Sequence, residues 1–142
     1  MSYDLSIRLK NRFSELSRLK DELHKYCEFR EIPSNVVFAI TLSLDEVITN
    51  VISYGYDDHD EHFINVTLRS GTGVIDISVE DDGKPFNPLE FETPDLKCAI
   101  DERPIGGLGI YLVKTYMNEL KYERAGEKNR LTMRKNTSPP AY

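Results

Sequence analysis

Apolar residues follow two different periods in the first thirty positions, and the change of period separates two elements. Leu5, Ile7 and Leu9 alternate with polar neighbours, which predicts a strand with one buried face. Between residues 12 and 29 the apolar positions recur every three or four residues, which predicts an amphipathic helix. The chain is therefore expected to open with a strand and a helix.

A second helical pattern follows Pro33 and runs as far as Gly55. Its apolar stripe recurs at helical spacing, and Ser34 or Asn35 is of the type that caps a helix N-terminus. Two β-rich segments come next, Phe63–Leu68 and Val74–Val79, separated by a short Gly-containing turn. This arrangement predicts an antiparallel hairpin.

The apolar residues show no sustained period between Asp81 and Ile105, a segment that contains four of the seven prolines. A loop this long usually has a function. A third helix is expected to begin at Gly106, with two short strands around Gly126 and a frayed tail over 137–142.

This order of elements predicts one domain over residues 1–136. The fold class is α+β: a two-layer sandwich in which a mixed, mostly antiparallel sheet is covered on one face by three helices.

Composition narrows the class of protein. The chain has 142 residues, 39% apolar and 30% charged, with a net charge of -6. These values are typical of a single globular domain, and the negative charge disfavours nucleic-acid binding. Cys27 and Cys98 stand alone, as reduced thiols do, and no apolar run is expected to be long enough to cross a membrane. We therefore expect a cytoplasmic protein.

Glu46 and Asn50 are four residues apart on the second predicted helix, so their side chains share one face. The amide oxygen of Asn50 suits Mg²⁺, which takes hard oxygen ligands and binds phosphates alongside few protein groups. The Glu46 carboxylate could accept a proton from an attacking hydroxyl. Taken alone, the pair is also what the solvent-facing side of an ordinary helix presents.

Asp81 and Gly83 follow a predicted strand directly. A carboxylate at that place could accept a hydrogen bond from the exocyclic amino group of adenine, and a glycine lets the backbone approach a flat ring. An ordinary Asp-Gly turn has the same sequence.

A cluster of glycines, Gly106, Gly107 and Gly109, precedes the third predicted helix. Backbone N–H groups and the helix dipole at such a point favour a phosphate. Arg103, just upstream, could contact a terminal phosphate, or it could be a surface arginine. His59 and His62 flank several acidic residues, which form either a metal cluster or, more simply, a solvated acidic turn.

The three motifs occur in a fixed order: Glu-x-x-x-Asn on a helix, Asp-x-Gly after a strand, and Gly-Gly-x-Gly before a helix. This order resembles the nucleotide-binding boxes of the histidine-kinase and gyrase-type (GHKL) ATPase superfamily. The segments 42–50, 81–86 and 106–113 look most like those of the stand-alone bacterial anti-sigma-factor serine kinases of the RsbW type.

The resemblance implies a Bergerat-type ATP-binding fold and a specific activity. Glu46 would be the base for transfer of the ATP γ-phosphate to a serine of an anti-anti-sigma protein of the STAS type, and Asn50 would hold Mg²⁺. For such a transfer, we expect Arg103 to help neutralise phosphate charge and the segment from Lys84 to Ile105 to close over the nucleotide as a lid. The residues that would contact ATP are Asn50, Asp81, Gly83, Gly106, Gly107, Leu108, Gly109 and, from the last strand, Thr132. A sigma factor would be a further partner, and the dimers common in that family suggest a homodimer.

Two other functions fit the same residues. One is a nucleotide-gated module that binds a regulator without phosphorylating it. The other is a structural α+β domain in which the boxes occur by coincidence.

Overall fold

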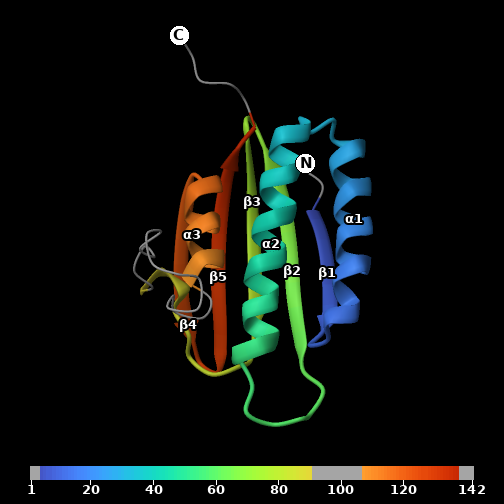
Figure 1. Ribbon diagram of the computed structural model, residues 1–142. Helices are drawn as coiled ribbons and strands as arrows, with labels where there is room; N and C mark the ends of the chain where they lie inside the picture. Colours follow the sequence, from blue (N-terminus) through green and yellow to red (C-terminus); the bar gives the residue numbers. More distant parts are fainter. Residues whose placement is uncertain (1–3, 91–106, 138–142) are drawn as a thin grey trace.

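A computed structural model describes residues 4–90 and 107–137, and five strands form one sheet in the order β1-β2-β3-β5-β4 (Figure 1). All four strand pairings are antiparallel, including the predicted hairpin. The elements are β1 (Asp4–Lys10), η1 (Phe13–Glu15), α1 (Leu16–Phe29), α2 (Ser34–Tyr54), β2 (Phe63–Gly71), β3 (Val74–Asp81), η2 (Pro88–Glu90), α3 (Gly107–Tyr116), β4 (Glu119–Ala125) and β5 (Lys128–Asn136).

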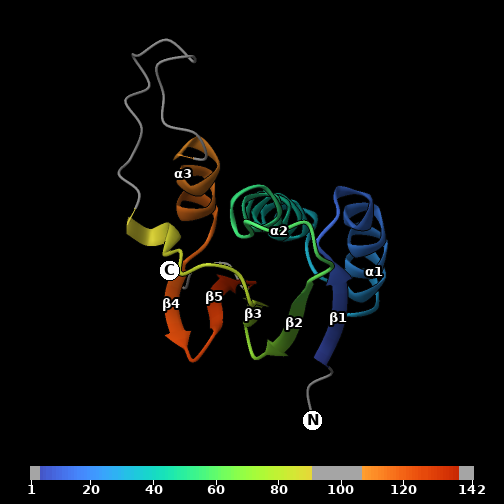
Figure 2. The ribbon, with the colours of Figure 1, turned by 90° about the horizontal axis from the view of Figure 1, so that it is seen from below.

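The three α-helices lie side by side on one face of the sheet, which confirms the predicted two-layer α+β fold (Figure 2). α1 lies over β1, α2 over the middle of the sheet, and α3 over the edge formed by β5 and β4. The sheet is antiparallel throughout the described strands, where the sequence suggested a mostly antiparallel one.

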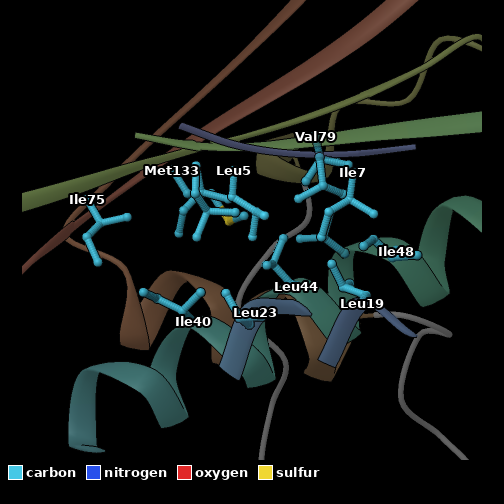
Figure 3. Packing of buried hydrophobic residues seen from close by; sticks show 14 of the residues in the cluster. Leu5, Ile7, Leu19, Leu23, Ile40, Leu44, Ile48, Ile75, Val79 and Met133 are labelled. Atoms are coloured by element: carbon cyan, nitrogen blue, oxygen red, sulfur yellow. The ribbon is translucent and has the colours of Figure 1, made fainter. Parts of the chain in front are cut away.

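The core lies between these two layers (Figure 3). Alternate residues of the strands and one stripe of each helix supply it, as the two periods in the sequence require. Figure 3 shows Ile7, Val79 and Met133 on the sheet side facing Ile40, Leu44 and Ile48 of α2. Each such side chain contributes roughly 1.5–3 kcal/mol when it is fully buried.

The apolar composition of α2 corrects one expectation. With 21 residues, α2 is long and apolar enough to span a membrane by length and composition. The sequence-based statement that no run reaches this length is therefore wrong. The physical reason is that α2 is the central core helix, with Ile40, Leu44 and Ile48 almost completely buried against the sheet.

Two local details differ from the predictions. Pro33, not Ser34 or Asn35, is the N-cap residue of α2, and no side chain caps that end. α1 begins at Leu16 because a 3-10 turn, η1, occupies the start of the segment that was predicted as one helix.

The turn between β2 and β3 is tight. Gly71 pairs with Val74, and Gly73 between them has a φ of 74°, a conformation that glycine adopts easily. The N–H of Thr137 donates to the carbonyl of Gly73 (2.9 Å), so the predicted tail is held at its first residue. Residues 138–142 of that tail lie outside the described residues.

The other face of the sheet carries no helix among the described elements and is lined by charged side chains. Arg130 pairs with Glu80 and Arg134 with Asp76 across β3 and β5, each with an N to O distance of 2.7 Å. Exposed pairs of this kind contribute little stability each. This face therefore presents a polar surface, and the core is built on the helix side alone.

Candidate functional site

A pocket opens at the end of α2, between this helix, the ends of β3 and β5, and the first residues after β3. It is mostly apolar with a few polar groups, as ligand pockets usually are. The lining residues are Val47, Asn50, Val51, Gly55, Val79, Asp81, Lys84, Phe86, Pro88, Ile110, Tyr122, Asn129 and Leu131.

Asp81 is the last residue of β3 and lies on the wall of this pocket, only 6% exposed. Its Oδ1 accepts hydrogen bonds from the backbone N–H of Gly83 (2.8 Å) and from Nδ2 of Asn129 (3.0 Å). Burial raises the pKa of the Asp81 carboxyl, and these two hydrogen bonds act against that rise. Within the described chain, Oδ2 accepts no hydrogen bond, so it remains available to a ligand.

Gly83 packs against the end of α2. A Cβ atom at Gly83 would lie 2.6 Å from the carbonyl oxygen of Gly55, and the next N–H, that of Lys84, donates to that same oxygen (2.8 Å). The lack of a side chain therefore lets the segment after β3 close onto α2. The sequence had suggested an approach to a flat ligand instead, and the neighbour that the structure shows is backbone.

Asn50 also lines the pocket, from the last turns of α2, and is 7% exposed. Its Nδ2 is buried and has no hydrogen-bond partner among the described residues. A buried N–H donor without a partner is costly, which indicates that this wall of the pocket receives a ligand with a hydrogen-bond acceptor.

Glu46 lies one turn before Asn50 and is in contact with the first turn of α3. A Cβ atom built on Gly109 would collide with Oε2 of Glu46. Burial, and secondarily the charge of Asp45, raise the pKa of the Glu46 carboxyl above its usual 4.5. Glu46 and Gly109, which are far apart in the sequence, thus meet close to the pocket wall formed by Asn50 and Ile110.

Asn129 is the functional candidate that the sequence analysis missed. It stands opposite Asp81 in the β3–β5 pairing, is 5% exposed and lines the pocket. Besides Asp81, its Nδ2 donates to the carbonyl of Lys84 (2.8 Å), and its Oδ1 accepts from the hydroxyl of Tyr122 (2.5 Å). Only the strand register reveals these contacts.

Thr132 does not face the pocket. It is three residues beyond Asn129 on β5, so its side chain lies on the opposite face of the sheet, in a shallow hollow beside Ser78 and Thr67. The structure therefore separates Thr132 from Asp81 and Asn50, and the sequence-based assignment to the nucleotide site is corrected on this point.

The structure describes some of the other residues that were predicted to contact ATP near the third helix. Gly107 and Leu108 begin α3, ahead of Gly109. Arg103 and Gly106 lie outside the described residues, as does most of the segment that was predicted to form a lid.

The acidic turn after α2 is folded around His62. Nε2 of His62 lies 2.7 Å from Oδ1 of Asp58, and Nδ1 lies 3.2 Å from Oδ1 of Asp82. The ring of Tyr56 stacks on the imidazole at 4.2 Å. No group of three or more His, Cys, Asp or Glu side chains suited to a metal occurs in the described part of the chain. This turn is a hydrogen-bonded connection to the segment after β3.

Fold and pocket together define a class of protein: an α+β domain with three helices on one face of an antiparallel sheet and a ligand pocket at the end of its central helix. Residues 9–135 match the family described as Histidine kinase-like ATPase domain, and the chain belongs to this family.

Several curated relatives are similar over most of the chain. The Serine/threonine-protein kinase BtrW of Bordetella bronchiseptica is 28% identical over 102 residues, 72% of each chain. An Anti-sigma F factor of Clostridium novyi is 30% identical over 105 residues, 68% of each chain. The Serine-protein kinase RsbW of Bacillus velezensis is 26% identical over 89 residues, 59% of this chain and 55% of its own.

The solved structures agree with the fold. The crystal structure of the RsbU and RsbW domains of a Mycobacterium tuberculosis protein superposes with a TM-score of 0.70 and 17% identity, and it covers 98% of this chain and 34% of that one. The Acinetobacter baumannii histidine kinase AdeS gives a TM-score of 0.52 at 12% identity, over 94% of this chain and 68% of that one. At these identities the similarity is one of fold.

Proposed function

We propose that this chain is an ATP- and Mg²⁺-dependent serine-protein kinase that acts as an anti-sigma factor and transfers the γ-phosphate of ATP to a serine of an anti-anti-sigma partner of the STAS type. Residues 1–136 would be the ATPase domain. The names of the relatives, two of them kinases and one an anti-sigma factor, support this function.

One observation carries the proposal. The pocket joins a buried strand-end carboxylate, Asp81, to a buried amide on α2, Asn50, with Glu46 one turn before Asn50 on the same helix. A nucleotide is a ligand with a hydrogen-bonding base at one end and phosphates at the other. The adenine amino group would donate to Oδ2 of Asp81, and the phosphates would extend toward α2 and α3.

The phosphates would meet the N-terminus of α3, which begins at Gly107. Unpaired N–H groups and the helix dipole favour an anion at this point. Arg103 and Gly106, which precede α3 in the chain, belong to the same proposal as contacts to the terminal phosphate.

The residues present suit Mg²⁺ bound together with a nucleotide. Among the described residues there is no all-protein cage of acidic ligands, and Asn50 offers one hard amide oxygen at the wall of the pocket. Mg²⁺ commonly keeps water and phosphate ligands and takes only one or two protein groups. When bound, it would neutralise charge on the phosphates.

Glu46 would orient the attacking serine hydroxyl and accept its proton. Its raised pKa makes the carboxylate a better proton acceptor than an exposed glutamate. Its contact with the first turn of α3 sets the carboxylate beside the helix end that would receive the phosphates.

Two measurements test the function. Calorimetric titration with ATP should show saturable binding that strengthens when Mg²⁺ is present, and no binding up to millimolar ATP would contradict the proposal. Incubation with γ-labelled ATP and a purified anti-anti-sigma protein should leave label on a partner serine.

The second candidate function is a nucleotide-gated binding module, which the same pocket would also serve. In that case ATP binds and the partner binds, but no label is transferred. The proposal further includes a sigma factor as a binding partner, a homodimer and a cytosolic location. Co-purification from cell extract and light scattering of the purified chain test the first two.

A further inference from the structure

We propose that His62 is a positioning residue for the nucleotide pocket: its imidazolium ties Asp82 to the turn after α2 and so holds the first residues after β3 in the form that receives ATP. The inference rests on the proposed function, because it takes ATP to be the ligand. His62 acts through Asp82 and has no direct role toward the nucleotide.

The segment after β3 is tied to the turn after α2 at two points. The N–H of Lys84 donates to the carbonyl oxygen of Gly55 (2.8 Å), and Nζ of Lys84 pairs with Oδ1 of Asp57 (2.9 Å). Two residues earlier, Oδ1 of Asp82 lies 3.2 Å from Nδ1 of His62. Both segments lie at the end of the molecule where α2 ends (Figure 1). Because Gly55 and Lys84 line the pocket, these ties determine the shape of its wall.

The imidazole of His62 is held between two carboxylates. Nε2 lies 2.7 Å from Oδ1 of Asp58, and Nδ1 lies 3.2 Å from Oδ1 of Asp82. Ionised carboxylates only accept hydrogen bonds, so both contacts form only if each ring nitrogen carries a hydrogen. The imidazolium has a hydrogen on both nitrogens, and the neutral ring has one. The two contacts together therefore belong to the charged form of His62.

Loss of the proton breaks one of the two contacts. The neutral ring can donate to one carboxylate, and its other nitrogen then faces an acceptor. The contact with Asp58 is the shorter one and is expected to persist, which leaves Asp82 without this partner. Asp82 comes directly after Asp81 on the pocket wall, so the wall is held less firmly when His62 is neutral.

The charged and titratable groups around His62 come from three parts of the chain. They are Tyr56 and Asp58 in the turn after α2, Asp82 after β3, and Glu61 with its partners Lys10 and Arg12 at the end of β1. The two cations pair with Glu61, and hydrogen bonds to Asp58 and then to Asp82 raise the pKa of the imidazole. These neighbours favour the imidazolium.

ATP affinity should therefore depend on the charge of His62. A partly exposed ion pair changes an equilibrium constant by up to about fivefold. The apparent affinity for a ligand falls in proportion to the fraction of chains that keep the binding-competent form. We expect the proton on His62 to strengthen ATP binding by about threefold, within the range of such a pair.

The experiment measures ATP affinity of the purified full chain with Mg²⁺, at constant ionic strength, at about pH 6 and about pH 9, on either side of the ordinary histidine pKa. His62→Gln keeps a polar side chain that does not titrate, and Asp82→Ala removes the carboxylate that His62 holds. The matched control is His59→Gln, which changes an exposed histidine of the same turn. Comparing chains at the same pH removes the contributions of other groups that titrate.

The wild-type chain should bind ATP about threefold more tightly than His62→Gln at the lower pH and about equally at the higher pH. Asp82→Ala should show the same loss at the lower pH, and His62→Gln should cost nothing further in that background. His59→Gln should follow the wild type at both pH values. If His62 served only to pack against Tyr56, its loss would weaken binding by the same factor at both pH values.

The inference is overturned if the ratio of wild-type to His62→Gln affinity is the same at both pH values, or if His62→Gln still weakens binding in the Asp82→Ala background. If His62→Gln does not fold, Asp82→Ala decides: its loss of affinity should be present at the lower pH and absent at the higher one. A chain that binds ATP without these differences keeps the proposed function. A wild-type chain that binds no ATP overturns the proposed function, and the inference with it.

Discussion

The side chain of Glu46 lies directly against Gly109, so that any side chain at position 109 would occupy the place of the Glu46 carboxylate. This contact joins α2 to the first turn of α3, two segments that approach each other only in the folded chain. The position of the Glu46 carboxylate therefore depends on how α3 packs against α2.

Glu46→Gln separates binding from transfer. The amide keeps the shape of the side chain but cannot accept the serine proton, so we expect ATP affinity within about twofold of wild type and a fall in phosphorylation rate of at least about a hundredfold. Calorimetry and labelled-phosphate transfer measure the two quantities. Asp45→Asn is the matched control, because Asp45 lies on the side of α2 that faces α1 and should retain activity at neutral pH.

The pH profile gives a second test of Glu46. Burial first, and then the charge of Asp45, raise the pKa of Glu46, and a base acts only when ionised. The transfer rate should therefore rise with pH through a value above 4.5, the usual one. Asp45→Asn removes one cause of the rise, so the acid limb should move to lower pH. An acid limb unaffected by this change would argue against Glu46 as the titrating group.

Gly109→Ala tests the contact itself. Alanine is favoured over glycine within a helix by about 1 kcal/mol, and the carboxylate of Glu46 can move aside, so we expect no loss of stability. The displaced carboxylate should slow phosphoryl transfer at least about tenfold. Thermal unfolding and transfer assays check the two parts, with Thr115→Ala on the exposed side of α3 as the control. Normal transfer by Gly109→Ala would show that the location of Glu46 does not matter.

Asp81→Asn should weaken ATP binding and leave the fold intact. Burial raises the pKa of the Asp81 carboxyl, so the folded chain binds the carboxyl proton more tightly than the unfolded chain does. The free energy of unfolding therefore falls as the pH rises and Asp81 ionises. Asparagine carries no charge, so at neutral pH the variant should be at least as stable as wild type. ATP affinity should fall at least about tenfold.

Denaturant unfolding and calorimetry measure both effects of Asp81→Asn. Glu80→Gln, the neighbouring residue whose carboxylate pairs with Arg130 on the outer face, should change neither by much. A large loss of stability in Asp81→Asn would mean that the carboxylate is there to hold the fold.

His62 should make stability depend on pH. Hydrogen bonds to Asp58 and then Asp82 raise the pKa of the imidazole in the folded chain. This stabilisation is complete below the unfolded pKa of about 6.5 and disappears as the pH rises through the folded value. His62→Gln should therefore lose more free energy of unfolding at about pH 5.5 than at about pH 9. An equal loss at both pH values would mean that packing against Tyr56 is the whole contribution.

The fold could be predicted from the sequence because the buried residues recur at every second position in the strands and at every third or fourth position in the helices. Leu5, Ile7 and Leu9 alternate and form an edge strand, and the stripe ending near Gly55 forms the central helix. The start of that helix was misplaced because Pro33 fixes the backbone before Ser34, and the serine side chain is not needed as a cap.

The candidate site was predictable only where spacing along one element fixed it. Glu46 and Asn50 share a helix face whatever surrounds them, and Asp81 follows from the end of its strand. Asn129 could not be found in this way, because it matters through its partner Asp81, which is distant in the sequence and adjacent in the sheet. The assignment of Thr132 to the pocket did not hold for a related reason. A residue three positions from Asn129 on a strand points to the opposite face of the sheet.

The central position of α2 has a consequence for synthesis of the chain. This helix leaves the ribosome before any residue of β2, β3 or β5, the strands that shield its apolar stripe, has been made. Until the last strand is complete, a nascent chain would display a hydrophobic segment of membrane-spanning length. We therefore expect chaperone demand to peak midway through translation and to decline once residue 136 has emerged.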